Sequence, residues 1–207
     1  MIDIWNVVAA ERGALADDLD GIGQAQWRAD SLCDGWSVRR VAAHLTATAS
    51  LTPLTFFGSF AGSSFNFDRF ANKQIDKHLG ADEAATLANF RAVRTSTSAP
   101  PGPKISWLGE VLVHAEDIRR PLGIAHSYPM DAVVAVADFY KGSNTLIGTK
   151  SRIAGLGLRA TDVDWSHGSG DEVAGPMMSL LMAMTGRAGA CDDLNGAGAE
   201  TLRSRGC

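Results

Sequence analysis

Cysteine is scarce in this chain of 207 residues, and the three present, Cys33, Cys191 and Cys207, lie far apart. An odd number of widely spaced cysteines argues against a disulfide framework. The chain also has no Cys-x-x-Cys pair, which excludes a zinc ribbon and a thioredoxin-type redox motif. We therefore expect a protein of a reducing compartment.

Long apolar runs and an excess of positive charge are also missing. The chain has no uninterrupted apolar run of about eighteen residues, the length that would predict a membrane-spanning helix. Acidic residues such as Asp3 and Glu11 near the start argue against a secretory signal. The net charge of -4 offers no basic face for a phosphate backbone. We expect a cytoplasmic, soluble protein without nucleic-acid or membrane partners.

The remaining composition is that of a globular protein, and apolar residues recur at helical spacing over most of positions 1–150. The clearest helix begins after Ser37, a residue type that often caps helix N-termini, and Pro53 interrupts it. Further helices are predicted over residues 106–120, ending at Pro121, and over residues 131–146.

The pattern changes after residue 150. Alternating apolar residues predict a strand over positions 156–160, and a second short strand is expected at 172–174. Pro176 favours the start of an apolar helix, and positions 189–198 are predicted to form a loop. The expected fold is mainly α: a four-helix bundle over 1–150, followed by a small α/β module over 151–207.

Two ionisable residues stand out on the helix predicted over 106–120. Glu110 and His114 are four positions apart, so they share one face, and Asp117 extends the same stripe. Their neighbours are apolar, and burying a carboxylate is costly unless a cation compensates it. The spacing therefore suits a metal site, although an exposed, solvated Glu–His pair would show the same spacing.

His44 has a similar setting on the helix that follows Ser37, where its neighbours are apolar. Facing helices of a bundle often project metal ligands inward. Two imidazoles and one carboxylate suit zinc with one open position, and they could also hold iron, nickel or cobalt. A histidine satisfied within the core is the structural alternative, and spacing alone leaves both interpretations open.

Other chemistries have little support. Neither Ser143 nor Ser179 lies in a Gly-x-Ser-x-Gly motif, which argues against acyl transfer of that type. No cysteine has an adjacent histidine that would mark it as a nucleophile. His78, His126 and His167 are expected to be solvated.

Three segments resemble the mycothiol-dependent maleylpyruvate isomerase family, which belongs to the DinB-like metal-binding helical bundles. Residues 32–45, Leu-Cys-Asp-Gly-Trp-Ser-Val-Arg-Arg-Val-Ala-Ala-His-Leu, are similar to its first signature. Residues 109–117, Gly-Glu-Val-Leu-Val-His-Ala-Glu-Asp, resemble the second. Residues 173–181, with Thr-Gly-Arg at 185–187, are similar to the C-terminal module. The segments occur in the order that the family has.

The resemblance implies that His44, Glu110 and His114 hold a divalent metal, with zinc as the expected ion. Asp117 would orient these ligands, and Asp117 or a metal-bound water would handle protons in catalysis. Arg187 would bind a substrate carboxylate. Mycothiol would be the thiol cofactor, adding to an electrophilic carbon of a small substrate such as maleylpyruvate. Addition and elimination would make the enzyme an isomerase, and release of the adduct would make it an S-transferase. Because these bundles often dimerise, the resemblance also allows a homodimer.

Two alternatives stay open at this point. A metal-dependent hydrolase of the same bundle would use water in place of a thiol. A non-catalytic protein would keep the bundle and bind a small ligand in its pocket. Binding of mycothiol to the zinc-loaded protein would separate the thiol-dependent enzyme from the hydrolase.

Overall fold

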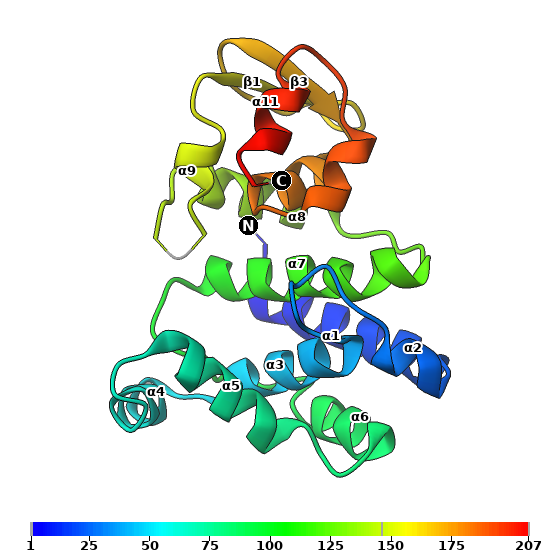
Figure 1. The fold of residues 1–207 in the computed structure, drawn as a ribbon, viewed down its shortest axis with the longest axis vertical. Helices are drawn as coiled ribbons and strands as arrows, with labels where there is room; N and C mark the ends of the chain where they lie inside the picture. Colours follow the sequence, from blue (N-terminus) through cyan, green and yellow to red (C-terminus); the bar gives the residue numbers. More distant parts are fainter. Residues whose placement is uncertain (1, 146, 207) are drawn as a thin grey trace. The chain divides into compact units, whose positions relative to one another are not determined.

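The computed structural model describes residues 2–145 and 147–206, which form helices and one small sheet (Figure 1). Contacts divide the chain into two compact units, Met1–His126 and Ser127–Cys207. This division falls earlier than the boundary near residue 150 suggested by the sequence. The reason is that α8 (Met130–Tyr140) packs against α10 (Met177–Met184) of the second unit.

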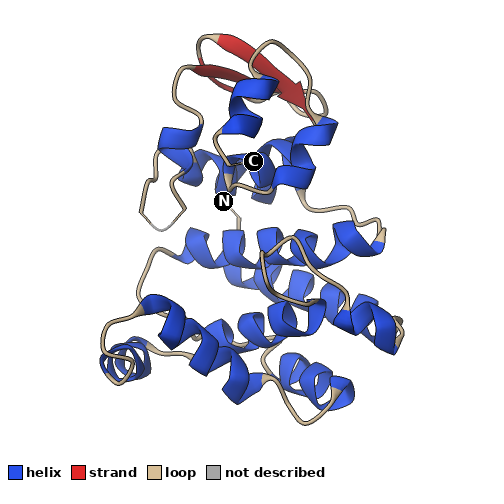
Figure 2. Ribbon diagram, viewed as in Figure 1, coloured by secondary structure: helices blue, strands red, loops and turns tan. Residues whose placement is uncertain are grey.

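The first unit is helical throughout. Its elements are α1 (Ile4–Asp20), α2 (Gln24–Arg28), α3 (Val38–Ser50), α4 (Pro53–Ala61), α5 (Phe67–His78), α6 (Glu83–Ala92) and α7 (Lys104–Leu122). Both α1 and α3 pack against α6 and against α7, so these four helices close a ring around a shared core. Within the described residues, strands occur only in the second unit (Figure 2). The mainly α fold predicted from the sequence is confirmed.

Polar side chains fix where several of these helices begin. Asp3, Ser37, Asn66 and Asp82 each accept a hydrogen bond from the backbone N–H three residues later. Such caps satisfy amide groups that have no partner within the helix. The start of α3 after Ser37 agrees with the sequence prediction, and the chain restarts as α4 at Pro53.

The end of α7 differs from its prediction. The helix does not stop at Pro121 but continues to Leu122, and Gly123 ends it in the left-handed conformation. A proline this close to the end removes one hydrogen bond, the one its N–H would have donated to the carbonyl of Asp117. That carbonyl instead accepts the N–H of Leu32 at 3.0 Å. The proline thus leaves an acceptor that fastens the loop before α3 to α7.

The second unit combines a three-stranded sheet with short helices. Besides α8 and α10, its elements are α9 (Thr149–Arg152), β1 (Leu156–Ala160), β2 (Ser166–Gly168), β3 (Asp171–Gly175), η1 (Ala188–Asp193) and α11 (Ala199–Ser204). The strand order is β2-β1-β3, with β1 antiparallel to β2 and parallel to β3. The strands expected at 156–160 and 172–174 are confirmed.

Two expectations for this unit need correction. The helix predicted over 131–146 ends at Tyr140, and position 146 lies outside the described residues. The stretch 189–198 is not all loop, because its first part forms the 3-10 helix η1, which packs against α10. Glycine and aspartate in that stretch suggested a loop, but contact with the apolar helix orders the backbone.

Cys191 in η1 is buried and disulfide-bonded. One bond is not the framework that the sequence argues against, yet it differs from the reduced cysteines we expected. Separation along the chain does not report proximity in the fold. Among residues 2–145 and 147–206, none of the helices combines the length and hydropathy needed to cross a bilayer.

Candidate metal centre

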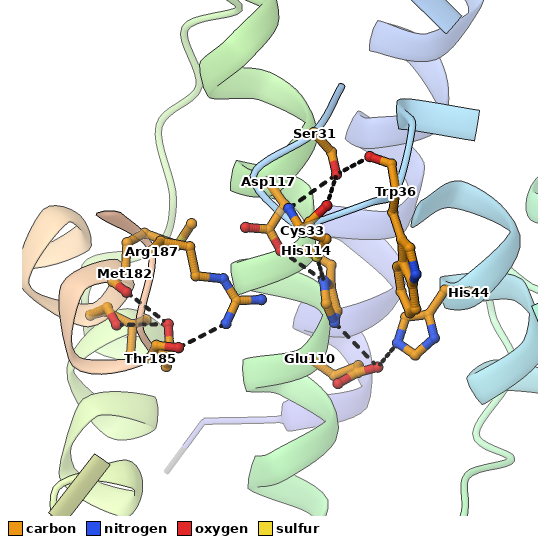
Figure 3. Close-up of polar contacts among 11 residues, drawn as sticks. Ser31, Cys33, Trp36, His44, Glu110, His114, Asp117, Met182, Thr185 and Arg187 are labelled. Atoms are coloured by element: carbon orange, nitrogen blue, oxygen red, sulfur yellow. Dashed lines mark hydrogen bonds and ion pairs between the residues drawn. The ribbon is translucent and has the colours of Figure 1, made fainter. Parts of the chain in front are cut away.

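Helices α3 and α7 bring three of the predicted site residues together (Figure 3). His44 Nε2 lies 2.6 Å from Glu110 Oε1, and His114 Nε2 lies 3.7 Å from the same oxygen. The three side chains are between 13% and 22% exposed, so the group is partly accessible to solvent. We call His44, Glu110 and His114 the triad.

The triad has a geometry that fits a metal ion. One ligand atom from each residue lies within 4.8 Å of the other two. A tetrahedral zinc ion keeps nitrogen and oxygen ligands about 3.3 Å apart, as its bond lengths of about 2.0–2.2 Å require. The two measured nitrogen–oxygen distances bracket this value, so small side-chain movements would suffice. The donor set also suits other ions that accept imidazole.

Glu110 and His114 lie one helical turn apart on α7, so they share one face of the helix, as the sequence predicts. Burial lowers the pKa of His114, but the charge of Glu110 and hydrogen bonds with Asp117 and Cys33 raise it to about 10. The second ring nitrogen, Nδ1, lies 2.8 Å from Asp117 Oδ2. An ion at Nε2 would therefore displace a proton while Asp117 keeps the ring oriented.

Asp117 is entirely buried, and it adjoins a residue that the sequence analysis passed over. The Cys33 thiol lies 3.0 Å from Asp117 Oδ2 and 3.4 Å from His114 Nδ1. The expectation that no cysteine has a histidine neighbour is therefore wrong for Cys33. The neighbour is 81 positions away in the sequence, so adjacency along the chain could not reveal it.

One turn delivers both Cys33 and Trp36 to the triad. The N–H of Trp36 donates to the carbonyl of Cys33 at 2.9 Å, and Gly35 has a φ of 71°. A type II turn requires such a positive φ at its third position, which favours glycine there. The Trp36 ring centroid lies 5.0 Å from that of His44, so the indole limits the movement of this imidazole.

A buried cation on α1 also acts on the triad. Arg12 is 4% exposed, and its guanidinium donates to the carbonyls of Val93 and Ser96. Burial lowers the pKa of Arg12 to about 10, and the negative charge of Glu110 partly opposes this. The reciprocal attraction stabilises the carboxylate of Glu110. The burial of Arg12 could be predicted from the sequence, because Arg12 lies on the same apolar face of α1 as Val8 and Leu15.

The remaining predicted site residue, Arg187, belongs to the second unit. It follows α10 and Gly186, whose φ is 91°, and its Nη1 donates to the carbonyl of Thr185 at 3.0 Å.

Of the histidines expected to be solvated, His126 has a partner: its Nε2 lies 2.8 Å from Glu11 Oε2. Glu11 is buried, so this contact supports the packing of the first unit.

Residues 8–104 match the family model described as the mycothiol maleylpyruvate isomerase N-terminal domain. The resemblance found in the sequence motifs is thereby confirmed. The matched range includes His44, whereas Glu110 and His114 lie just beyond it and join His44 through the packing of α7 on α3.

Solved structures show the same fold. A crystal structure of the mycothiol-dependent maleylpyruvate isomerase matches with a TM-score of 0.63, and that of a histidine-to-alanine mutant with 0.61. Each is 15% identical in sequence, and each match covers 95% of this chain and 92% of the other. No curated protein matches the sequence significantly. At this identity the structural likeness establishes the fold alone.

Proposed function

We propose that this protein is a metal-dependent enzyme that uses mycothiol to isomerise a small electrophilic substrate such as maleylpyruvate, or to transfer the thiol to it. The observation that carries the proposal is the convergence of His44, Glu110 and His114 next to a domain of the mycothiol maleylpyruvate isomerase family. Zinc is the proposed ion because two imidazoles and a carboxylate leave it one open position.

The triad residues would hold the ion through His44 Nε2, a Glu110 oxygen and His114 Nε2. A bound zinc ion lowers the pKa of a coordinated thiol, which makes the thiolate available near neutral pH. Glu110 is a ligand in this proposal and not the general base. The buried Arg12 favours its charged form, as ligation requires.

Asp117 acts as a positioning residue in this proposal. Its carboxylate accepts a hydrogen bond from His114 Nδ1, which directs the lone pair of Nε2 toward Glu110. Because Asp117 is fully buried, its contact with the ring supports this role better than direct proton exchange with substrate. Arg187 remains the proposed partner of the substrate carboxylate, since a guanidinium can bind both oxygens.

Metal content measured by elemental analysis tests the centre without a substrate. Wild-type protein should contain close to stoichiometric zinc, and His44→Ala should lose most of it. His78→Ala is the matched control, because His78 lies on α5 and is not a triad member. Full zinc retention by His44→Ala would reject the proposed centre.

Calorimetric titration of the zinc-loaded protein with mycothiol tests the cofactor. Saturable binding that disappears in His44→Ala, together with conversion of maleylpyruvate to its trans isomer, supports the isomerase. Thiol binding with release of an adduct supports the transferase. If the zinc-loaded wild type does not bind mycothiol, the thiol-dependent function is rejected and the hydrolase alternative gains support.

A further inference from the structure

A second group of potential metal ligands lies at the opposite nitrogen of His114. The sulfur of Cys33 lies 3.4 Å from His114 Nδ1 and 3.0 Å from Asp117 Oδ2. The distance between His114 Nδ1 and Asp117 Oδ2 is 2.8 Å. Figure 3 shows Cys33 and Asp117 beside His114, with His44 and Glu110 at the other end of the ring. We call Cys33, His114 and Asp117 the thiol cluster.

Backbone hydrogen bonds of the loop before α3 hold Cys33 in the thiol cluster. The N–H of Leu32 donates to the Asp117 carbonyl, the acceptor that Pro121 leaves without its helical donor. Ser31 Oγ accepts the N–H of Cys33 at 3.1 Å and donates to the carbonyl of Trp36 at 2.7 Å. These bonds hold the thiol against α7 by contacts on both sides of Cys33.

The ligand chemistry of the thiol cluster differs from that of the triad. Both groups contain one carboxylate and the His114 imidazole, but the thiol cluster has a thiol where the triad has a second imidazole. A thiolate is a soft ligand and favours soft ions such as cadmium. A tetrahedral zinc site would place sulfur and nitrogen about 3.5 Å apart and nitrogen and oxygen about 3.3 Å apart. The measured distances are 3.4 and 2.8 Å. The three side chains would have to move slightly apart to make room for a zinc ion, and further apart for a larger ion.

We propose that Cys33, Asp117 and Nδ1 of His114 form a second metal site, selective for soft divalent ions, whose occupation excludes an ion from the triad. The exclusion follows from the chemistry of the shared ring. A neutral imidazole has one lone pair, so an ion at Nδ1 leaves the proton on Nε2, which lies 3.7 Å from Glu110 Oε1. Ligation at both nitrogens would require the imidazolate anion.

Protons account for the charge changes. Binding at the thiol cluster releases the Cys33 thiol proton and any proton on His114 Nδ1 to solvent, and no oxidation occurs. Binding at the triad instead leaves a proton on Nδ1, and this N–H donates a hydrogen bond to Asp117. The two sites are thus alternatives selected by the softness of the ion. This inference shares His114 with the proposed function but does not depend on mycothiol.

Cadmium titration under metal-free conditions tests the second site, because a cadmium–thiolate bond absorbs in the ultraviolet. The band should appear in wild type with one equivalent, disappear in Cys33→Ser and persist in His44→Ala, which alters the triad alone. Cys191 is disulfide-bonded, so the titration is done without reductant. Circular dichroism shows whether each variant is folded. Absence of the band in wild type, or its persistence in Cys33→Ser, would overturn the proposal.

Competition between zinc and cadmium tests the exclusion. With both ions supplied, elemental analysis should find their sum limited to one ion per chain, with cadmium displacing zinc. In Cys33→Ser, cadmium should lose this advantage while zinc still binds. Two ions bound together per chain would overturn the exclusion. A wild type that binds cadmium at Cys33 but never zinc would reject the proposed function alone, so the two failures are distinguishable.

Discussion

The two units differ in what they bury. Every charged residue that is buried within the described chain belongs to the first unit: Glu11, Arg12, Glu116, Asp117 and Arg119. The buried polar residues of the second unit are the uncharged Thr149, Ser179 and Thr185, and its core is otherwise apolar. Burial of charge is expensive, so its concentration in one unit needs a structural or functional reason.

In the first unit these buried charges lie on α1 and α7, and α7 also carries Glu110 and His114 of the triad. Arg119 binds Asp18 at 2.7 Å, and Arg12 interacts with Glu110. The second unit relies instead on aliphatic contacts between α8, α10 and β1. This difference supports the proposed metal centre, because a polar interior would hold its ligands in place, whereas an apolar interior suffices in the second unit.

The largest expected effect comes from removing the buried charge itself. Arg119→Met should destabilise the protein by about 3–5 kcal/mol, because Glu11 would be left buried without this cation. Partial exposure of Asp18, at 26%, places the value toward the lower end. Urea unfolding gives the free energy. Arg91→Met is the matched control, since Arg91 pairs with Asp20 at the surface and should cost about 1 kcal/mol or less.

An apolar truncation tests the other side of the comparison. Leu180→Ala in α10 removes a fully buried side chain and should cost about 2–5 kcal/mol through lost packing and a cavity. Leu180→Met nearly conserves the volume and should cost under about 1.5 kcal/mol. Thermal unfolding and urea unfolding measure both. Equal losses in the two variants would contradict an interior that depends on close aliphatic packing.

Metal binding should stabilise the first unit selectively. Zinc at a concentration about 100 times its dissociation constant should add about 2.7 kcal/mol of stability. Hydrogen exchange on α3 and α7, compared with α8 and α10, locates the gain. A chelator should reverse it, and His44→Ala should abolish it while His78→Ala retains it. A zinc-dependent gain in protection that persists in His44→Ala would argue against binding at the triad.

The smallest expected effect tests the turn before α3. Gly35→Ala should cost about 1–2 kcal/mol, because an L-residue at a φ of 71° is strained. No atom would meet the added methyl group within 4 Å, so the cost is conformational. Gly142→Ala in the second unit has equal space without a positive φ and should be nearly neutral. Differential scanning calorimetry distinguishes them, and a neutral Gly35→Ala would contradict the strain argument.

The helical character, the cap at Ser37 and the shared face of Glu110 and His114 could be predicted from residue spacing alone. These features depend on residues within about one helical turn of one another, and such spacing is visible in the chain. The family motifs added His44 to the pair. The end of α7 was predicted less well, because the rule that proline stops helices took no account of the loop donor that replaces its missing N–H.

Only the tertiary structure decided the roles of Cys33 and Arg12. Cys33 meets His114 and Asp117 across 81 and 84 positions, and Arg12 reaches the carbonyl of Ser96 across 84. Contacts at such separations depend on how α1, α3 and α7 pack and on the loop fastened to α7. Local periodicity carries no information about them. The surroundings of the triad, which control its charge and orientation, therefore emerge only when the chain is folded.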